Sequence, residues 1–166
     1  MEPPMTLPGK PVRESKHETT QQVLPGDTNP MGTAFGGTIM AWIDIAGAVA
    51  AMRHARTTVV TASIDEMHFI ATIKLGDLVI LSSSVNYAGR TSMEVGVRVD
   101  SENPRTGERH HTGSCYVTFV AIDEQGRPVE VPPVIPESKD EKRRYADAQE
   151  RRRHRLAARE ARRSRG

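Results

Sequence analysis

A single carboxylate lies in the middle of the longest apolar segment of the chain. From Thr38 to Met52 almost every residue is apolar, and Asp44 carries the only charge. A helix that is apolar on every side is expected to be buried or wrapped by other elements. A carboxylate there is costly unless it is paired or hydrogen-bonded, and functional sites collect such groups. Asp44 is therefore predicted to act as a general base or to orient a water. The alternative is a structural carboxylate or an interface salt bridge.

Two glycines open this helix, in the run Phe35-Gly36-Gly37-Thr38. The first amides of a helix lack intrahelical partners and lie at the positive end of its dipole, and glycine lets a substrate approach the backbone. Gly36, Gly37 and Thr38 are therefore predicted to contact a carbonyl oxygen as negative charge develops on it. Asp44 follows Gly37 by two turns, on nearly the same helix face. The simpler alternative is that the glycines only permit a sharp loop and close packing.

Two further polar stretches are candidates for substrate contact. The amide of Asn29 is suited to orienting a water or a carbonyl, although an Asn before Pro30 is also a common turn former. The run Gly89-Arg90-Thr91-Ser92 combines a guanidinium with two hydroxyls in a tight turn before a strand. This combination predicts a phosphate contact; an ordinary charged hairpin turn is the alternative.

Other chemistries find little support in the residues. The four central histidines lack the spacing of a zinc motif, so no metal is expected; these histidines are His54, His68, His110 and His111. The sequence also shows no nucleotide-binding glycine motif, and no cofactor is expected. Cys115 lies among strand residues and is predicted to be a buried, inert thiol. The run Ser82-Ser83-Ser84 lacks the glycines of a nucleophile elbow, which argues against a serine hydrolase.

The order of elements predicts an α+β fold. Strands are expected at 17–23, 59–69, 78–87, 91–100 and 109–122, with the helix after the first of them. Short turns join the last three strands, as in an antiparallel meander. One apolar helix with one such sheet predicts that the sheet curls around the helix.

Composition divides the chain into three parts. Residues 1–15 hold four prolines and are expected to be disordered. Residues 16–136 are expected to form the folded domain, and residues 137–166 a basic helical tail. From Lys139 onward there are 12 Lys and Arg against 5 Asp and Glu. A solvated tail is the preferred interpretation, ahead of a nucleic-acid or acidic partner. One cysteine, no apolar run of membrane length and no signal-peptide pattern predict a cytoplasmic protein.

Taken jointly, these motifs resemble the hotdog-fold acyl-CoA thioesterase family, and most closely its cytosolic, brain-type branch with the bacterial relatives. The resemblance rests on residues 27–29, Gly32, residues 35–37 and residues 42–44, and on the downstream runs 60–65, 73–77, 89–95 and 131–134. It implies a five-stranded antiparallel sheet around a long central helix. It also implies active sites at the interface of a homodimer, with dimers commonly gathered into a trimer of dimers.

The resemblance also implies roles for individual residues. Asp44 matches the helix-borne catalytic carboxylate, and Asn29 a loop residue that acts with the carboxylate of a neighbouring subunit. Gly36 and Gly37 match the thioester-carbonyl contact, and residues 90–92 the region that meets the CoA phosphates. Pro30 departs from many relatives, which carry a polar residue there, and it restricts Asn29 to extended conformations.

The expected reaction is the hydrolysis of a fatty acyl-CoA to a free fatty acid and CoA. Asp44 is expected to act as a base on water, with a nucleophilic role through a mixed anhydride as the second possibility. The alternative functions are a non-catalytic acyl-CoA or acyl-carrier-binding module, a hotdog dehydratase and a tail that binds RNA or a membrane surface. A dehydratase is disfavoured because no histidine lies in the loop before the helix.

Overall fold

A computed structural model describes residues 6–166 of the chain. Its two long helices are α1 (Gly36–Ala55) and α2 (Lys139–Arg163). The five strands of the main sheet are β2 (His17–Gln22), β3 (Thr58–Ile64), β4 (Leu78–Ala88), β5 (Ser92–Glu102) and β6 (Arg109–Ile122). Two short strands, β1 (Lys10–Pro11) and β7 (Val134–Ile135), and two 3₁₀ turns, Val12–Glu14 and Pro25–Asp27, complete the list.

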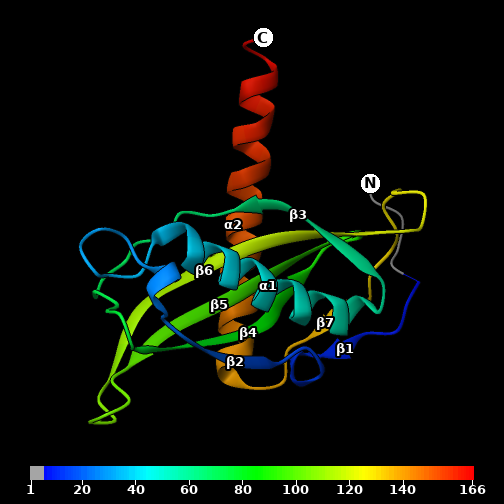
Figure 1. Cartoon of the computed structure of the whole chain (residues 1–166). Coiled ribbons are helices and arrows are strands. Elements are labelled where there is room, and N and C mark those ends of the chain that lie inside the picture. Colours follow the sequence, from blue (N-terminus) through cyan, green and yellow to red (C-terminus); the bar gives the residue numbers. More distant parts are fainter. Residues whose placement is uncertain (1–5) are drawn as a thin grey trace.

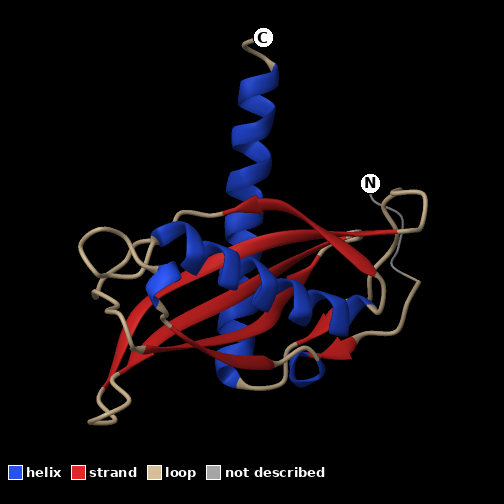
Figure 2. Ribbon diagram, viewed as in Figure 1, coloured by secondary structure: helices blue, strands red, loops and turns tan. Residues whose placement is uncertain are grey.

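The main sheet is antiparallel, in the order β2-β4-β5-β6-β3. It curls around α1, which lies against its concave face (Figure 1; Figure 2). Alternation along β4 and β5 supplies the core, because every second residue points inward. Val79, Leu81 and Val85 are fully buried, as are Val95 and Val99. The predicted five-stranded sheet around a central helix is confirmed. β3 ends at Ile64, five residues before the predicted end of that strand.

α1 is only half buried in the single chain. The side toward the sheet is closed, and its buried residues are Ile39, Ile43, Ala46, Gly47, Ala50, Ala51 and His54. On the other side Ile45 is 63% exposed and Met52 42% exposed. The expectation that the whole helix is enclosed is therefore wrong for one chain. The sheet covers one face of the helix, and nothing within residues 6–166 covers the other.

Part of the segment expected to be disordered is ordered. β1 pairs in parallel with β7, and the Lys10 amide donates to the Pro133 carbonyl at 2.9 Å. Val12 is buried at 3% exposure and Ser15 is fully buried. The expectation of disorder is corrected for residues 10–15, which are held by a segment more than 120 positions later in the chain. For residues 1–5 that expectation falls outside the described residues.

α2 crosses the opposite, convex face of the sheet, and its C-terminal half projects beyond the body (Figure 1). Ser138 caps the helix, with its hydroxyl accepting from the Glu141 amide at 3.1 Å. Ala148 is buried, and Tyr145 meets the Tyr87 ring edge-on with 5.1 Å between centroids. In the described part of the chain, neither helix is long and apolar enough to cross a membrane.

A buried carboxylate fixes α2 to the sheet. Glu94 of β5 has only 1% of its side chain exposed, and it accepts two bonds of 2.9 Å from Arg151. Asn86 and Arg155 also donate to Glu94, at 3.2 and 3.3 Å. The Arg151 guanidinium stacks 3.6 Å from the centre of the Tyr116 ring. The charge is thus paired and hydrogen-bonded, which a buried carboxylate requires.

The burial of His54 at the end of α1 predicts that the fold loses stability in acid. Its Nε2 donates to the Pro132 carbonyl at 2.7 Å, while Nδ1 is buried without a partner. Burial lowers the pKa of His54 below its usual 6.5, and the nearby Lys10 lowers it further. The unfolded chain therefore binds this proton at a higher pH than the folded chain. Stability should fall as the pH falls below about 6.5 toward the folded pKa.

Thermal melts between pH 7.5 and pH 5 check this expectation. The melting temperature should drop on acidification, and His54→Gln should show a shallower drop than the parent chain. His110→Gln, at an exposed position, serves as the control and should keep the parent slope. Equal slopes for the parent and His54→Gln would contradict the assignment to His54.

Candidate active site

Asp44 faces β3 and accepts a hydrogen bond from a strand hydroxyl. The Thr61 Oγ1 atom donates to Asp44 Oδ1 at 2.6 Å. Asp44 is half-buried on α1, and Thr61 is exposed on the edge strand β3. The carboxylate is therefore held in one orientation while one side remains open. This geometry suits a base that must reach a bound substrate.

Thr61 is a site residue that the sequence reasoning missed. Threonine is a common strand former, so its presence in a β-branched run carries no functional signal. Thr61 is the last residue before a bulge in β3, because the β3–β6 register shifts between Thr61 and Ser63. Such a bulge re-aims side chains, and bulges are common beside active sites. The sequence shows only that the Thr61 hydroxyl follows Asp44 by 17 residues, and this separation does not indicate a contact.

The first turn of α1 presents unused backbone donors. Phe35 precedes the helix and offers no side-chain cap. The amides of Thr38 and Ile39 both donate to the Phe35 carbonyl, at 3.0 and 3.3 Å. No acceptor within residues 6–166 is recorded for the amides of Gly36 and Gly37. The donors available for a substrate carbonyl are therefore Gly36 and Gly37, whereas the Thr38 amide is already in use.

Glycine at position 37 allows close packing against Phe35, as well as the approach of a substrate to the backbone. A Cβ atom at this position would lie 2.6 Å from Cε1 of the Phe35 ring. Asp44 lies seven residues further, about 10 Å along the helix axis. Its side chain leans toward the helix N-terminus, because Cα–Cβ bonds tilt in that direction. The remaining space can hold a carbonyl at the amides and a water at the carboxylate.

A small cavity lies beside these amides. It measures about 300 Å³ and is lined by residues 33–34, Ile39 and residues 69–73. The Phe69 ring lies 4.0 Å from the position that a Cβ on Gly36 would take. Six of the eight lining residues have apolar side chains, the exceptions being Thr33 and Thr72, so hydrocarbon can contact this cavity.

The side chain of Asn29 bonds only within its own loop in the described structure. Its Oδ1 accepts from the amides of Met31 and Thr33, at 3.0 and 3.2 Å. Its Nδ2 donates to Thr33 Oγ1 at 2.8 Å. Pro30 is accommodated in this turn. One chain therefore does not join Asn29 to Asp44 by a hydrogen bond.

The run from Gly89 to Ser92 forms the β4–β5 turn and is held on two sides. The Gly89 amide donates to the Ser92 carbonyl at 2.8 Å, and Arg90 O accepts from the Val131 amide at 2.8 Å. Arg90 is exposed. A Cβ on Gly89 would lie 3.2 Å from the guanidinium of Arg152. α2 thus brings a second cation to this turn, which could not be predicted because Arg152 is one of ten arginines in the tail.

The turn and the start of α1 lie at opposite ends of that helix. The Ala34 amide donates to the Ile73 carbonyl at 2.8 Å, which places the helix start near the beginning of β4. At the other end of α1, His54 bonds Pro132, and the neighbouring Val131 bonds Arg90. The separation is about 30 Å, the length of a 20-residue helix. One chain therefore does not bring Arg90, Thr91 and Ser92 to Gly36.

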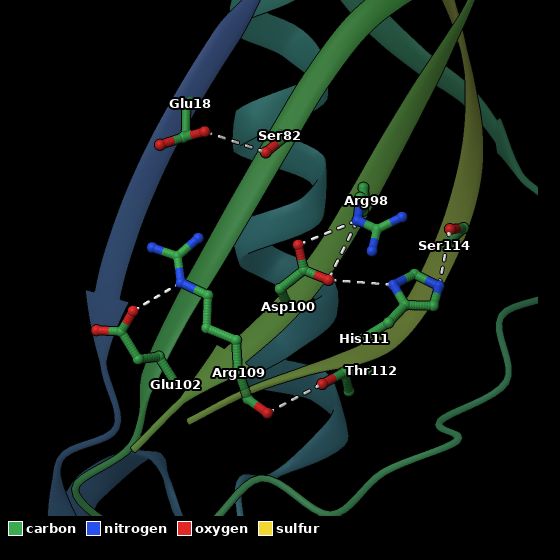
Figure 3. Close-up of polar contacts among 10 residues, drawn as sticks. Glu18, Ser82, Arg98, Asp100, Glu102, Arg109, His111, Thr112 and Ser114 are labelled. Carbon is green, nitrogen blue, oxygen red and sulfur yellow. Dashed lines mark hydrogen bonds and ion pairs between the residues drawn. The ribbon is translucent and has the colours of Figure 1, made fainter. Parts of the chain in front are cut away.

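A Ser-His-Asp arrangement occurs on the outer face of the sheet (Figure 3). Ser114 Oγ lies 3.5 Å from His111 Nε2, and His111 Nδ1 lies 3.2 Å from Asp100 Oδ1. The first distance is at the limit of a hydrogen bond. Ser114 sits in the middle of a strand opposite Arg98, not on a strand-to-helix turn with free amides. Ser114 pairs within the β5–β6 ladder, and the arrangement forms a polar chain on the surface of the sheet.

Cys115 is buried, as predicted. Burial raises the pKa of its thiol to about 11, with the nearby Asp65 adding to the effect. A thiol with so high a pKa is almost wholly protonated at neutral pH, so it is a poor nucleophile. The candidate chemistry therefore stays with Asp44, Thr61 and the amides of α1.

The chain is similar to known acyl-CoA hydrolases. The Thioesterase superfamily matches residues 31–108. YkhA of Bacillus subtilis (strain 168), which is named as an uncharacterized acyl-CoA thioester hydrolase, is 45% identical over 78% of this chain and 75% of its own length. The human cytosolic acyl coenzyme A thioester hydrolase is 31% identical over 82% of this chain and 36% of its own length.

Solved structures of acyl-CoA hydrolases are similar to this chain in fold and in sequence. An apo-hexameric acyl-CoA thioesterase superimposes with a TM-score of 0.88 at 46% identity, covering 92% of this chain and 97% of that one. The Staphylococcus aureus acyl-CoA hydrolase, in complex with butyryl coenzyme A and coenzyme A, gives a TM-score of 0.87 at 42% identity, covering 95% and 96%.

Three variants of the Staphylococcus aureus enzyme match the spacing of the site described above. They replace one Asn, one Asp and one Thr by Ala, with separations of 15 and 17 residues. Asn29, Asp44 and Thr61 have the same two separations. Fold, sequence and spacing lead to one conclusion: the chain belongs to the hotdog-fold acyl-CoA thioesterase family and is an acyl-CoA hydrolase.

Proposed function

We propose that the chain hydrolyses fatty acyl-CoA thioesters with Asp44 as the general base. The observation that carries this proposal is the 2.6 Å hydrogen bond from Thr61 to Asp44, on the helix whose first amides are unused. Residues with the same spacing are the ones replaced in the Staphylococcus aureus variants. Thr61 acts as a positioning residue, which holds one carboxylate oxygen and leaves the other for water.

The proposed reaction needs only the substrate, water and the protein. The amides of Gly36 and Gly37 hold the thioester oxygen, and Asp44 removes a proton from a water as it attacks the carbonyl carbon. The C–S bond then breaks, and the thiolate leaves as CoA after protonation. No metal or redox cofactor takes part, because a thiolate is a good leaving group. The acyl chain occupies the cavity of about 300 Å³ beside Gly36.

Two chains are proposed to form each site. Asn29 is proposed to approach the Asp44 of a neighbouring subunit with the second hydrogen of its Nδ2, because the described chain uses only one of the two, toward Thr33 Oγ1. The turn 89–92 reaches CoA phosphates with Arg90, and Arg152 stands beside it. In one chain this turn lies a full helix length from Gly36, so a partner must bring the two ends together.

The exposed surface supports such a dimer. β3 is an edge strand, and Val60 and Ile64 are 44% and 40% exposed. Ile45 and Met52 of α1 lie exposed as well, at 63% and 42%. An unpaired edge beside apolar side chains favours pairing with another chain. We propose that β3 pairs with its symmetry mate, and that dimers assemble into a hexamer, as in a hexameric relative.

A panel of acyl-CoAs from acetyl to palmitoyl tests the proposed function, with free thiol as the readout. Turnover that peaks at one chain length supports the acyl cavity beside Gly36. Binding of CoA without release of free thiol would instead support the alternative of a non-catalytic binding module. Cytoplasmic location and a tail without nucleic-acid partners stay predictions, which cell fractionation and a nucleic-acid retention assay would check.

A further inference from the structure

A cationic side chain of α2 reaches the segment that follows β3. The guanidinium of Arg155 donates to Asp65 Oδ2 at 3.0 Å, and the two side chains are 26% and 25% exposed. Asp65 is the first residue after β3, which ends at Ile64. The same guanidinium nitrogen also donates to the buried Glu94 at 3.3 Å. Arg155 therefore joins the C-terminal helix both to the sheet and to the connection between β3 and β4.

The first part of this connection is bonded to β6 at two points. The Asp65 amide donates to the Tyr116 carbonyl at 2.9 Å. Five residues later, the Ile70 amide donates to the Thr112 carbonyl at 2.9 Å. Between these points, no backbone hydrogen bond is recorded for residues 66–69 within the described part of the chain. Backbone hydrogen bonds therefore hold this stretch at its two ends, and the ion pair reinforces the first of them.

The same connection then forms most of the wall of the cavity beside Gly36. Residues 69–73 supply five of the eight residues that line this cavity. The Phe69 ring reaches the start of α1, 4.0 Å from the position that a Cβ on Gly36 would take. The far end of the wall is fixed to the same helix start, because the Ala34 amide donates to the Ile73 carbonyl at 2.8 Å. The shape of the cavity therefore depends on how the connection is held.

We propose that Arg155 is a positioning residue for the acyl end of the site. Through Asp65 it fixes the start of the connection whose Phe69 bounds the cavity, so that the wall keeps its contacts with a long acyl chain. This inference rests on the proposed function, in which the acyl chain occupies this cavity. The reacting end is held separately, because β3 pairs with β6 as far as Ile64 and Thr61 lies within that paired stretch.

The split between KM and kcat separates this role from a purely structural one. An ion pair that only stabilises the fold changes the amount of active enzyme, and its loss lowers the apparent kcat equally for every substrate. A positioning residue acts on binding of the acyl chain, so its loss raises KM and leaves kcat nearly unchanged. The effect should grow with chain length, because a short acyl group places little hydrocarbon against Phe69.

Steady-state kinetics of the full chain, with the shortest and longest acyl-CoAs that wild type hydrolyses, test the proposal. Arg155→Ala should raise KM for the longest substrate about tenfold, the effect of one lost methylene contact in an apolar pocket. Asp65→Ala keeps the contact of Arg155 with Glu94 and should raise the same KM. The double variant should add little to either change, because both remove one contact. Arg153→Ala, whose partner is exposed on the same helix, should leave both constants unchanged.

The outcomes distinguish this inference from the proposed function. Phe69→Ala should raise KM for the longest substrate in the same way, because it removes part of the wall. If it did not, the acyl chain would lie elsewhere and the positioning role would be overturned. An equal loss of kcat for short and long substrates in Arg155→Ala and Asp65→Ala, with KM unchanged, would overturn that role and leave hydrolysis standing. Absence of thiol release by wild type with every acyl-CoA would overturn the proposed function itself, and this inference with it.

Discussion

Replacing Asp44 by alanine is expected to lower kcat for acyl-CoA hydrolysis by roughly 100-fold or more. This is the usual loss when a general base is removed from a positioned site. Substrate affinity should change less, because the amides of Gly36 and Gly37 and the acyl cavity are untouched. Thr61→Val should show a smaller loss, about tenfold, because it removes the hydrogen bond that orients the carboxylate and leaves the charge in place.

Asp140→Ala is the matched control for this experiment. Asp140 is an exposed carboxylate at the start of α2, and its loss should leave kcat unchanged. If Asp44→Ala kept more than about a tenth of the activity, its role as base would be wrong. A single turnover in water labelled with heavy oxygen separates base from nucleophile. A base places the label in the fatty acid, whereas a mixed anhydride first transfers unlabelled oxygen from Asp44.

Replacing Arg151 by alanine is expected to produce the largest loss of stability among the α2 variants. Glu94 would keep its charge with 1% of its side chain exposed, and it would lose both bonds of 2.9 Å. Breaking a buried pair in this way costs about 3 kcal/mol. The lower end of the usual range applies because 27% of the Arg151 side chain is exposed, and because Asn86 and Arg155 still donate to Glu94. For a chain of this size, the melting temperature should fall by roughly 6–12 °C.

Arg153→Ala tests whether this loss is specific to the Glu94 contact. Arg153 lies two residues away on the same helix, and it pairs with Glu150, which is exposed. Surface pairs of this kind contribute about 0–1 kcal/mol, so the melting temperature should change by little. Equal shifts for Arg151→Ala and Arg153→Ala would show that the Glu94 contact has no special weight.

Local patterns predicted the elements and the helix that carries Asp44. Two patterns were informative: the alternation along β4 and β5, and the apolar run around Asp44. Both patterns depend only on residues that are close together in the sequence. Asp44 was recognisable because a charge in an apolar helix is an exception to its surroundings. The glycines at the helix start were recognisable for a similar reason, because they mark a place where the backbone must be approached.

Long-range contacts could not be predicted in the same way. Glu94 and Arg151 are 57 residues apart, and nothing in the composition of either segment indicates the other. The basic tail therefore looked like a solvated helix, although its first half is docked on the sheet. The same limit applies to β1 and β7, which pair across most of the chain, and to Thr61, which bonds a carboxylate 17 residues away on another element.

In one chain the side chain of Asn29 bonds only its own loop and not Asp44, and this separation has a consequence for inheritance. In the proposed dimer each chain supplies Asn29 to one pocket and Asp44 to the other. A chain that lacks only Asn29 and a chain that lacks only Asp44 are each inactive when paired with a copy of themselves. When the two are paired with each other, one pocket contains both intact residues. Two defective alleles of this gene should therefore complement each other within a single cell.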